Sequence, residues 1–228
     1  MPSTDPGALR QPERKVPIWD ISTRLFHWLT AALVLAAYVT WQLDWMDWHA
    51  KAGDAVLTLV TFRFLCGFFG SDTTRFASFI ASPRAALDHL AHVFRREPDR
   101  QVGHNPAGGW MVLLLIALLF GETLSGLYVA DDVADQGPLT QLTPAWIANA
   151  ITALHWIVWD ALLAAVALHV LAILTYAAAK GQNLLTPMIT GSKLLPVGTP
   201  APHLIGPARA AALLGCSALA VAALASLV

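Results

Sequence analysis

Four histidines lie in or beside the most apolar stretches of this chain, where an ionisable side chain is costly unless it has a partner or a function. They are His27, His49, His155 and His169. His155 and His169 are 14 residues apart, which on one helix places them within about 40° of the same face and about 21 Å apart along the axis. A single helix would therefore present two imidazoles to the same side, one near each end of a membrane span.

The composition indicates that these histidines lie in a membrane protein. Hydrophobic residues make up 56% of the 228 residues and charged residues only 13%, about half the charged fraction of an ordinary soluble domain. The net charge of -1 gives no field that would attract nucleic acid. Cys66 and Cys216 both lie in apolar runs, and no Cys-x-x-Cys-His motif occurs that would attach a haem covalently.

Five apolar runs have the length of about 20 residues that a helix needs to cross a bilayer core of about 30 Å. They extend from about Ser22 to Leu43, His49 to Gly70, Gly108 to Tyr128, Thr152 to Ala179 and Ala208 to Val228. We therefore predict an all-α integral membrane protein, in which four transmembrane helices form a bundle and a fifth follows at the C-terminus. Between the second and third runs, residues 83–96 have the spacing of an amphipathic helix on the membrane surface.

The basic residues predict the orientation, because they concentrate in the loops that stay in the cytoplasm. Lys51 is the one basic residue in the loops of the opposite side. On the predicted cytoplasmic side lie Arg10, Arg14, Lys15, Arg24, Arg75, Arg84, Arg95, Arg96, Arg100, Lys180 and Lys193. The N-terminus is therefore expected inside the cell and the C-terminus outside, in a multi-pass protein.

This orientation pairs the four histidines by depth. His27 and His169 fall in the inner half of the membrane, and His49 and His155 in the outer half. Two neutral imidazoles facing one another across a bundle are what six-coordinate haem iron needs for electron transfer. The pattern thus predicts two non-covalent b-type haems, held by the pairs His27/His169 and His49/His155.

Other interpretations of the histidines remain open. They could form hydrogen bonds between helices, or serve a haem-free transporter or metal-ion-handling bundle. A zinc or copper site is a weaker fit, because two histidines at each depth leave a zinc shell incomplete. His89 and His92, in the amphipathic segment, have a spacing that would allow a shared metal, but histidines on an exposed amphipathic helix are more often simply polar surface residues.

Four further ionisable residues in the spans are candidates for a role beside the histidines. Arg63 is 14 residues from His49 and so faces the same way at the depth of the inner histidines, where it could bind a haem propionate. Arg24, one turn before His27, is a second propionate candidate. Glu122 could relay protons released when a quinol is oxidised, or it could be a neutral, hydrogen-bonded acid. Asp160 has the same two interpretations.

Seven short segments, together with the histidines, resemble the bacterial cytochrome b561 family, which includes the b-type subunits of nickel-iron hydrogenases. The resemblance extends over about residues 17–193. The segments are WDISTRLFHW (19–28), FRFLCGFFGS (62–71), GHNPAGGWMV (103–112), ETLSGLY (122–128), LHW (154–156), ALHV (167–170) and LLTPMITGSK (184–193).

The resemblance implies a four-helix diheme cytochrome with ligands on the first, second and fourth helices, at the positions of His27, His49, His155 and His169. It also implies electron transfer between membrane quinone and a redox partner, either a c-type cytochrome or a dehydrogenase or hydrogenase subunit. The chain would then act as a quinol-oxidising or quinone-reducing subunit of an oxidoreductase in a bacterial inner membrane, with a periplasmic C-terminus. His104, in the GHNP segment, matches a family signature and not an axial ligand.

The expected organisation has three parts. Residues 1–17 form a cytoplasmic tail, residues 18–193 form the diheme four-helix domain, and residues 194–228 form a linker and the fifth helix. That last helix lies outside the resemblance.

Overall fold

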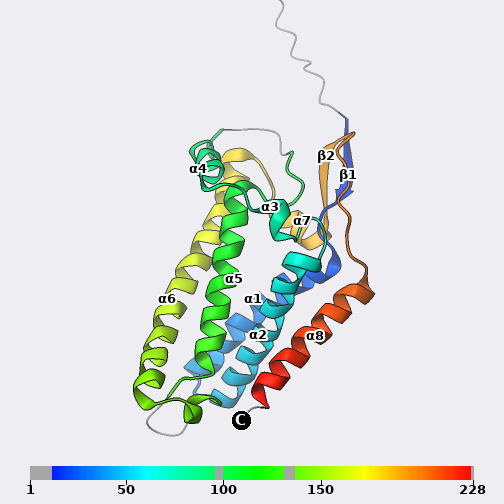
Figure 1. Cartoon of the computed structure of the whole chain (residues 1–228). Helices are drawn as coiled ribbons and strands as arrows, with labels where there is room; N and C mark the ends of the chain where they lie inside the picture. The colour runs from blue at the N-terminus through cyan, green and yellow to red at the C-terminus, as the bar shows by residue number, and fades with distance from the viewer. Residues whose placement is uncertain (1–11, 96–99, 131–136, 227–228) are drawn as a thin grey trace, which may run out of the picture.

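The computed structural model describes residues 12–95, 100–130 and 137–226 of the chain. Long helices run the length of the molecule, and a two-stranded sheet and short helices gather at one end (Figure 1). We call this end, which carries β1, β2, α3, α4 and α7, the sheet end. The loops that join α1 to α2 and α5 to α6 lie at the opposite end, as does the C-terminus.

Five of the described helices are long and apolar enough to cross a membrane. This agrees with the predicted spans to within a few residues at most ends, although α6 begins earlier than expected. The five are α1 (Ile21–Gln42), α2 (Met46–Phe69), α5 (Pro106–Gly126), α6 (Ala145–Thr175, continued by the π-helical segment Tyr176–Lys180) and α8 (Pro207–Ala225). The predicted architecture, a multi-pass helical membrane protein with an additional C-terminal helix, is confirmed.

Side-chain caps define where the first and third of these helices begin. Asp20 precedes α1, and its carboxylate accepts a hydrogen bond of 2.7 Å from the backbone N–H of Thr23. Asn105 precedes α5 and accepts one of 2.7 Å from Gly108 N–H, with Pro106 at the first helical position, where its missing N–H costs nothing. Each cap satisfies a backbone donor that a helix start leaves unpaired.

Helix α2 lies at the centre of the packing. It contacts α1, α5 and α8, and α5 in turn contacts α6. Its buried positions include Val56, Leu57 and Val60, which pack with Ile116 of α5 and Leu162 of α6. The C-terminal helix α8 therefore covers α2 and leaves much of α6 facing outward (Figure 1).

A small antiparallel sheet, absent from our prediction, joins distant parts of the chain. Strand β1 (Glu13–Pro17) pairs with β2 (Ser192–Pro196), with Val16 opposite Lys193. The backbone N–H groups of Ile18 and Trp19 extend the contact by donating to Gly191 O at 2.8 and 3.0 Å. The sheet thus connects residues on both sides of the predicted boundaries at 17 and 193.

The remaining short elements connect the long helices. Helix α4 (Pro83–Ala91) is shorter than the helix predicted over residues 83–96. After Ala91 the backbone N–H groups of His92 and Val93 bond to the carbonyls three residues back, so turns replace the helix. Arg96 and Arg10 lie outside the described residues. The other short elements are α3 (Phe76–Phe79), α7 (Leu185–Thr190) and the 3₁₀ turn η1 (Thr140–Leu142).

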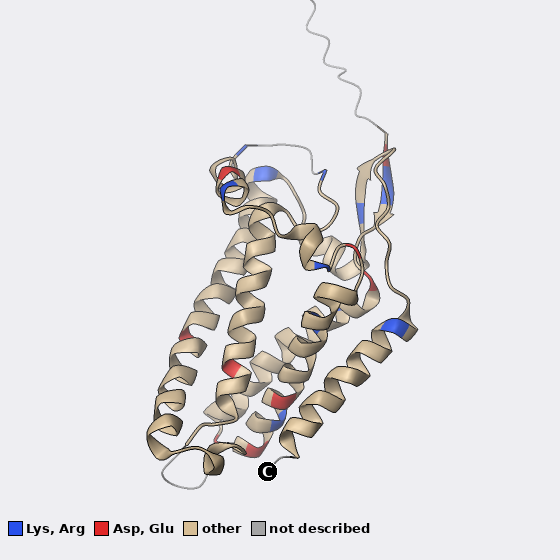
Figure 2. Cartoon of the chain, in the orientation of Figure 1, with Lys and Arg blue, Asp and Glu red and all other residues tan. Residues whose placement is uncertain are grey.

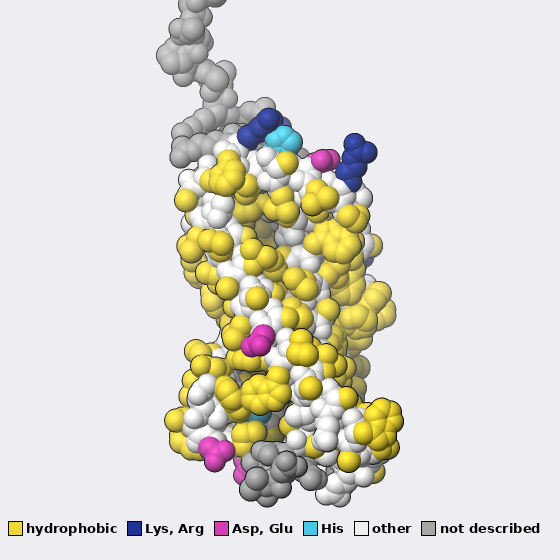
Figure 3. Space-filling model, turned by 90° about the vertical axis from the view of Figure 1, so that its left-hand side faces the viewer, with side chains coloured by type: hydrophobic (Ala, Val, Ile, Leu, Met, Phe, Trp, Pro, Cys, Tyr) yellow, Lys and Arg dark blue, Asp and Glu magenta, His cyan; other side chains and the backbone are white. Residues whose placement is uncertain are grey.

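Charge and hydrophobicity divide the surface in the way a membrane protein requires. Lys and Arg gather mainly at the sheet end, whereas the long helices carry few charges (Figure 2). Large apolar side chains such as Leu35 of α1 and Leu219 of α8 are more than half exposed. Hydrophobic side chains also dominate the face seen in Figure 3. Such a surface is suited to lipid.

Candidate functional site

His27 and His169 face one another between α1 and α6, in the half of the bundle nearer the sheet end. Their ring centroids are 6.3 Å apart and the rings are inclined by 53°. An imidazole nitrogen lies about 2 Å from a first-row metal, and the atoms of a five-membered ring with bonds of about 1.35 Å lie about 1.15 Å from its centroid. Two imidazoles on opposite sides of one metal ion therefore have centroids about 6.3 Å apart, and this pair has that spacing.

Helix α1 also brings Arg24 to the sheet end, where it contacts α7. Its Nη1 donates a hydrogen bond of 2.7 Å to Ile189 O. Among the described residues, neither Arg24 Nε nor His27 Nδ1 has a hydrogen-bond partner, although both atoms are buried. An additional acceptor beside Arg24, and a donor or acceptor beside His27, would therefore satisfy these two atoms.

Arg63 enters the same region from α2 and is 4% exposed. Its Nη1 donates to Thr74 O at 3.1 Å, and its guanidinium carbon lies 5.8 Å from the ring centres of both Phe76 and Phe79. No carboxylate of the described residues lies within ion-pair distance of it. A buried cation held by one carbonyl and two rings can still accept an anionic partner.

His104 lies beside this arginine, in the connection before α5. Its ring packs between Trp19 and Phe79, with centroids 4.7 and 4.9 Å away, and its buried Nδ1 has no partner among the described residues. Burial, followed by the positive charge of Arg63, lowers the pKa of His104 to about 3. His104 is therefore neutral at physiological pH.

The second pair, His49 of α2 and His155 of α6, lies toward the end opposite the sheet end (Figure 1). In both residues Nδ1 contacts a backbone carbonyl. His49 Nδ1 donates to Ala37 O at 2.9 Å, and His155 Nδ1 donates to Glu122 O at 3.0 Å, with Ser125 Oγ 2.9 Å away. Since a carbonyl can only accept, Nδ1 carries the proton and the Nε2 lone pair is free in each ring.

Glu122 of α5 lies close to the unprotonated Nε2 of His155. Its Oε1 lies 3.3 Å from His155 Nε2, while its Oε2 is buried with no partner among the described residues. A carboxyl beside the candidate ligand, in an apolar bundle, is placed to hold or pass a proton.

Gly126, one of the small residues of α5, makes room for the His155 ring. A β-carbon at Gly126 would lie 3.3 Å from His155 Cε1, which is tighter than ordinary van der Waals contact. A larger side chain would push the ring out of its position.

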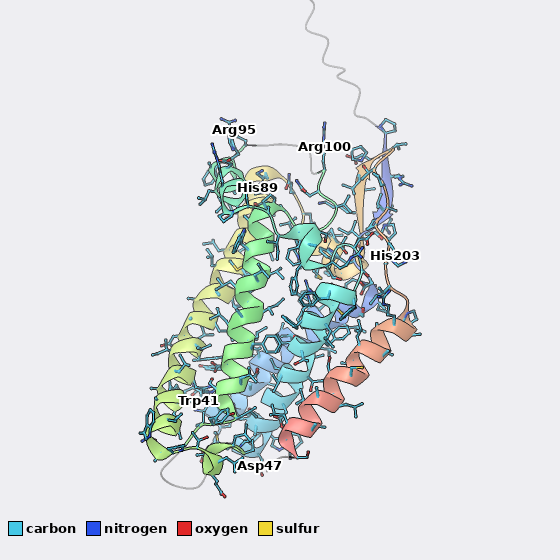
Figure 4. All side chains as sticks on the ribbon, in the orientation of Figure 1. Trp41, Asp47, His89, Arg95, Arg100 and His203 are labelled. Atoms are coloured by element: carbon cyan, nitrogen blue, oxygen red, sulfur yellow. The ribbon has the colours of Figure 1, made fainter. Side chains whose placement is uncertain are left out.

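Two aromatic pairs hold α1 and α6 together near this second histidine pair. Tyr38 stacks on Trp159 with centroids 5.7 Å apart, and Trp41 packs edge-on against Trp156 at 5.3 Å. Figure 4 shows Trp41 in the half of the molecule away from the sheet end. His89, Arg95, Arg100 and His203 lie in the other half, nearer the sheet end.

The remaining histidines do not form a metal centre in the described part of the chain. His89 Nε2 forms a hydrogen bond of 2.8 Å with Tyr176 Oη, whereas His92 Nδ1 donates to Asp88 O at 2.7 Å. The two rings are thus directed to different partners. No group of three or more metal-binding side chains occurs among the residues described.

Comparison with known protein families identifies the family of this chain. The family model described as prokaryotic cytochrome b561 matches residues 18–191, well over half of the chain. The chain belongs to the prokaryotic cytochrome b561 family. No curated protein and no solved structure matches it.

Membership of the b561 family confirms the resemblance found in the sequence and implies b-type haem and membrane electron transfer. The match ends before α8. All four candidate histidines, Arg24, Arg63 and Glu122 lie inside it, whereas the fifth helix is an addition to the b561 core.

Proposed function

We propose that this b561 cytochrome holds two haems and passes electrons between the quinone pool and a redox partner protein. The observation that carries the proposal is the arrangement of the four histidines at two levels of the bundle, with His27 facing His169 across α1 and α6. His27 and His169 have the ring spacing of two ligands on one metal ion. His49 and His155 donate from Nδ1 to a carbonyl, which leaves Nε2 as the unprotonated nitrogen of each ring.

In this proposal His27 and His169 hold one haem and His49 and His155 hold the other. Bound b-type haem would supply an iron centre that changes charge by one electron. The carbonyls of Ala37 and Glu122 fix the tautomer and orientation of two of the ligands and raise their basicity. With two protein ligands on each iron, no position is left for a substrate at the metal.

The arginines would anchor the haem nearer the sheet end. Arg63 is the stronger propionate candidate, because its buried guanidinium has no carboxylate partner among the described residues. Arg24 is the second candidate, since its buried Nε lacks a partner there. A charge-assisted hydrogen bond to a propionate would satisfy either group.

Glu122 would take part in proton transfer at the other haem. Oxidation of a quinol releases two protons, and these need an acceptor where the bundle excludes water. The Glu122 carboxyl, with one oxygen near His155 and one buried oxygen free, is suited to accept one of them.

The basic residues of the sheet end predict that this end faces the cytoplasm and that the C-terminus lies in the periplasm of a bacterial inner membrane. The redox partner would be a c-type cytochrome or a dehydrogenase or hydrogenase subunit. The chain would then serve as the quinol-oxidising or quinone-reducing subunit of that assembly.

A visible spectrum of the purified protein tests the proposal. We expect a reduced-minus-oxidised b-type band, two haems per chain, and reduction of both by a quinol analogue under anaerobic conditions. A chain without a b-type band would instead support the haem-free transporter or metal-handling alternative. Haem that no quinol analogue reduces and no quinone reoxidises would leave the cytochrome intact and exclude the quinone link.

A further inference from the structure

Lys180 is a buried lysine where α6 reaches the sheet end. It is the last residue of the π-helical segment that continues α6, an uncommon helical geometry often found at functional sites. The residue is 5% exposed, and its Nζ lies 5.8 Å from the centre of the Tyr176 ring. No carboxylate of the described residues lies within ion-pair distance of it. A buried ammonium held by a ring alone can still take an anionic partner.

The proposed haem site does not supply that anion. Lys180 lies 11 residues beyond His169 on the same helix, which is about 16 Å along the axis. This distance exceeds the radius of a haem together with its propionates. The anion that pairs with Lys180 would therefore be a separate ligand.

The surface of α6 remains apolar up to this position. Leu171 and Leu174 are both more than half exposed, and Ala177 and Ala178, which follow them, are also exposed. Such a surface is suited to acyl chains, which would reach to within about one helical turn of Lys180. The ammonium thus lies where the hydrocarbon ends and the phosphate layer of the membrane begins.

Helix α4 lies against the same end of α6. His89 Nε2 of α4 forms a hydrogen bond of 2.8 Å with Oη of Tyr176, the residue whose ring contacts Lys180. On α4 itself, Leu87 is 67% exposed and Leu90 48%. Exposed apolar side chains on a short amphipathic helix are typical of one that lies in the membrane interface.

Basic side chains surround this interface helix. Arg84 of α4 and Arg95 just after it are both exposed, with Asp88 as the acidic residue between them. Figure 4 shows His89 and Arg95 close together at this edge of the sheet end. Positive charge at a membrane surface attracts anionic lipids, by about fivefold in affinity for each basic residue.

We propose that Lys180 binds the phosphate of an anionic phospholipid, with the headgroup beside α4 and the acyl chains along α6. Lys180 Nζ would donate to the phosphate oxygens, in a charge-assisted bond that the buried ammonium otherwise lacks. A free phosphate ion offers the same oxygens, but the apolar surfaces of α6 and α4 favour a ligand that carries acyl chains. This goes beyond the proposed electron transfer and does not depend on it.

A binding measurement on the natural protein tests the proposal without any substitution. Radiolabelled phosphatidylglycerol is titrated into the purified chain in a neutral detergent, and the lipid that elutes with the protein is counted. We expect saturation at one lipid per chain, retained at about 1 M salt, where the attraction of exposed charges is screened beyond about 3 Å. Diacylglycerol with the same acyl chains should not compete, and inorganic phosphate should compete only in large excess.

Charge variants then test the role of Lys180. Lys180→Met keeps the aliphatic stem and removes the charge, so the affinity for phosphatidylglycerol should fall about tenfold, as for loss of a hydrogen bond to a charged group. Lys180→Arg should retain the affinity. Arg209→Met is the matched control, because Arg209 is an exposed cation in the first turn of α8, and it should change the affinity little at about 1 M salt. Monodisperse elution shows that each variant has folded.

Four results would overturn the lipid site. Natural protein that takes up phosphatidylglycerol without saturation would exclude a specific site, and equal losses for Lys180→Met and Arg209→Met would show that general surface charge attracts the lipid. Displacement by an equal concentration of inorganic phosphate would assign Lys180 to a free phosphate ion. Competition by diacylglycerol would show that acyl chains bind without the phosphate.

Discussion

The orientation of two of the four histidine rings, those of His49 and His155, is set by backbone carbonyls of neighbouring helices. Ala37 O and Glu122 O already belong to helices α1 and α5, and each accepts an additional bond from a histidine Nδ1. Each of these carbonyls also accepts from a hydroxyl of its own helix, Thr40 Oγ1 at 3.0 Å and Ser125 Oγ at 3.0 Å, so several donors share each oxygen. The two imidazoles are thus oriented by helices and not by loops, which is how a site is preorganised for a cofactor.

Glu122→Gln tests the proton role of that residue. The amide has nearly the same shape but does not take up a proton at neutral pH, so quinol oxidation should slow, by about a hundredfold if Glu122 acts as the base. Both haem bands should persist, since the change leaves the four histidines in place. Stopped-flow reduction by a quinol analogue measures the rate, and an unchanged rate would exclude Glu122 from the proton path.

The lowered pKa of His104 predicts how the stability of the protein depends on pH. The folded protein keeps this side chain neutral because its pKa is lowered to about 3, whereas a histidine in the unfolded chain binds a proton below about pH 6.5. The unfolded state therefore gains protons as pH falls from 6.5 toward 3, and stability decreases over that window.

His104→Phe should remove that contribution, because phenylalanine keeps a ring between Trp19 and Phe79 but does not titrate. The melting temperature of the variant should fall less steeply than that of the natural protein between pH 7 and about pH 5. Parallel curves for the two proteins would show that His104 does not stay neutral in the folded state.

The sequence predicted the types and depths of the site residues but not their hydrogen bonds. Spacing along one helix is enough to place His155 and His169 on one face, because helix geometry is regular. The bond from His49 to Ala37 depends on how α1 and α2 rotate against each other, and no local pattern encodes that rotation. The same holds for Thr74 as the partner of Arg63.

At the scale of elements, Asp20 ties the start of α1 to the α2–α3 connection. Its carboxylate accepts from Ser22 Oγ and Thr23 N–H, and its other oxygen accepts from Ser71 Oγ at 2.5 Å. Burial alone would raise the pKa of Asp20, but these hydrogen bonds outweigh it and lower the pKa below its usual value. At neutral pH the carboxylate is therefore ionised and contributes its full stabilisation.

Asp20→Ala should destabilise the protein by about 1–2 kcal/mol, the typical cost of losing a helix N-cap. Thermal unfolding followed by tryptophan fluorescence measures this, with Asp20→Asn as the control that keeps a capping acceptor. Equal losses for the alanine and asparagine variants would mean that the charge, and not the cap, provides the stability.

The two-stranded sheet is an element that the sequence did not predict. Strands β1 and β2 are five residues each, and Glu13 pairs with Pro196 almost the whole length of the chain away. Strands this short carry little periodic signal, and their pairing depends on α1 and α7 meeting at the sheet end. Long apolar spans, by contrast, are specified by composition alone, so all five were found.

At the scale of the whole molecule, the distribution of basic residues predicts the topology. The sheet end carries most Lys and Arg (Figure 2), so it should face the cytoplasm. Because α8 runs from the sheet end to the opposite end, the C-terminus should be periplasmic. Fusions of alkaline phosphatase and of green fluorescent protein to the C-terminus test this: the phosphatase should be active and the fluorescent protein dark. The reverse pattern would invert the topology.

The central claim is that two histidine pairs hold two separate haems, and ligand deletion tests it most directly. Haem per chain and the reduced-minus-oxidised spectrum are measured for the purified natural protein, for His155→Ala and for His169→Ala. We predict two haems in the natural protein and one in each variant, with different haems lost, so that the two residual spectra or midpoint potentials differ. Retention of both haems in either variant, or loss of the same haem in both, would contradict the account.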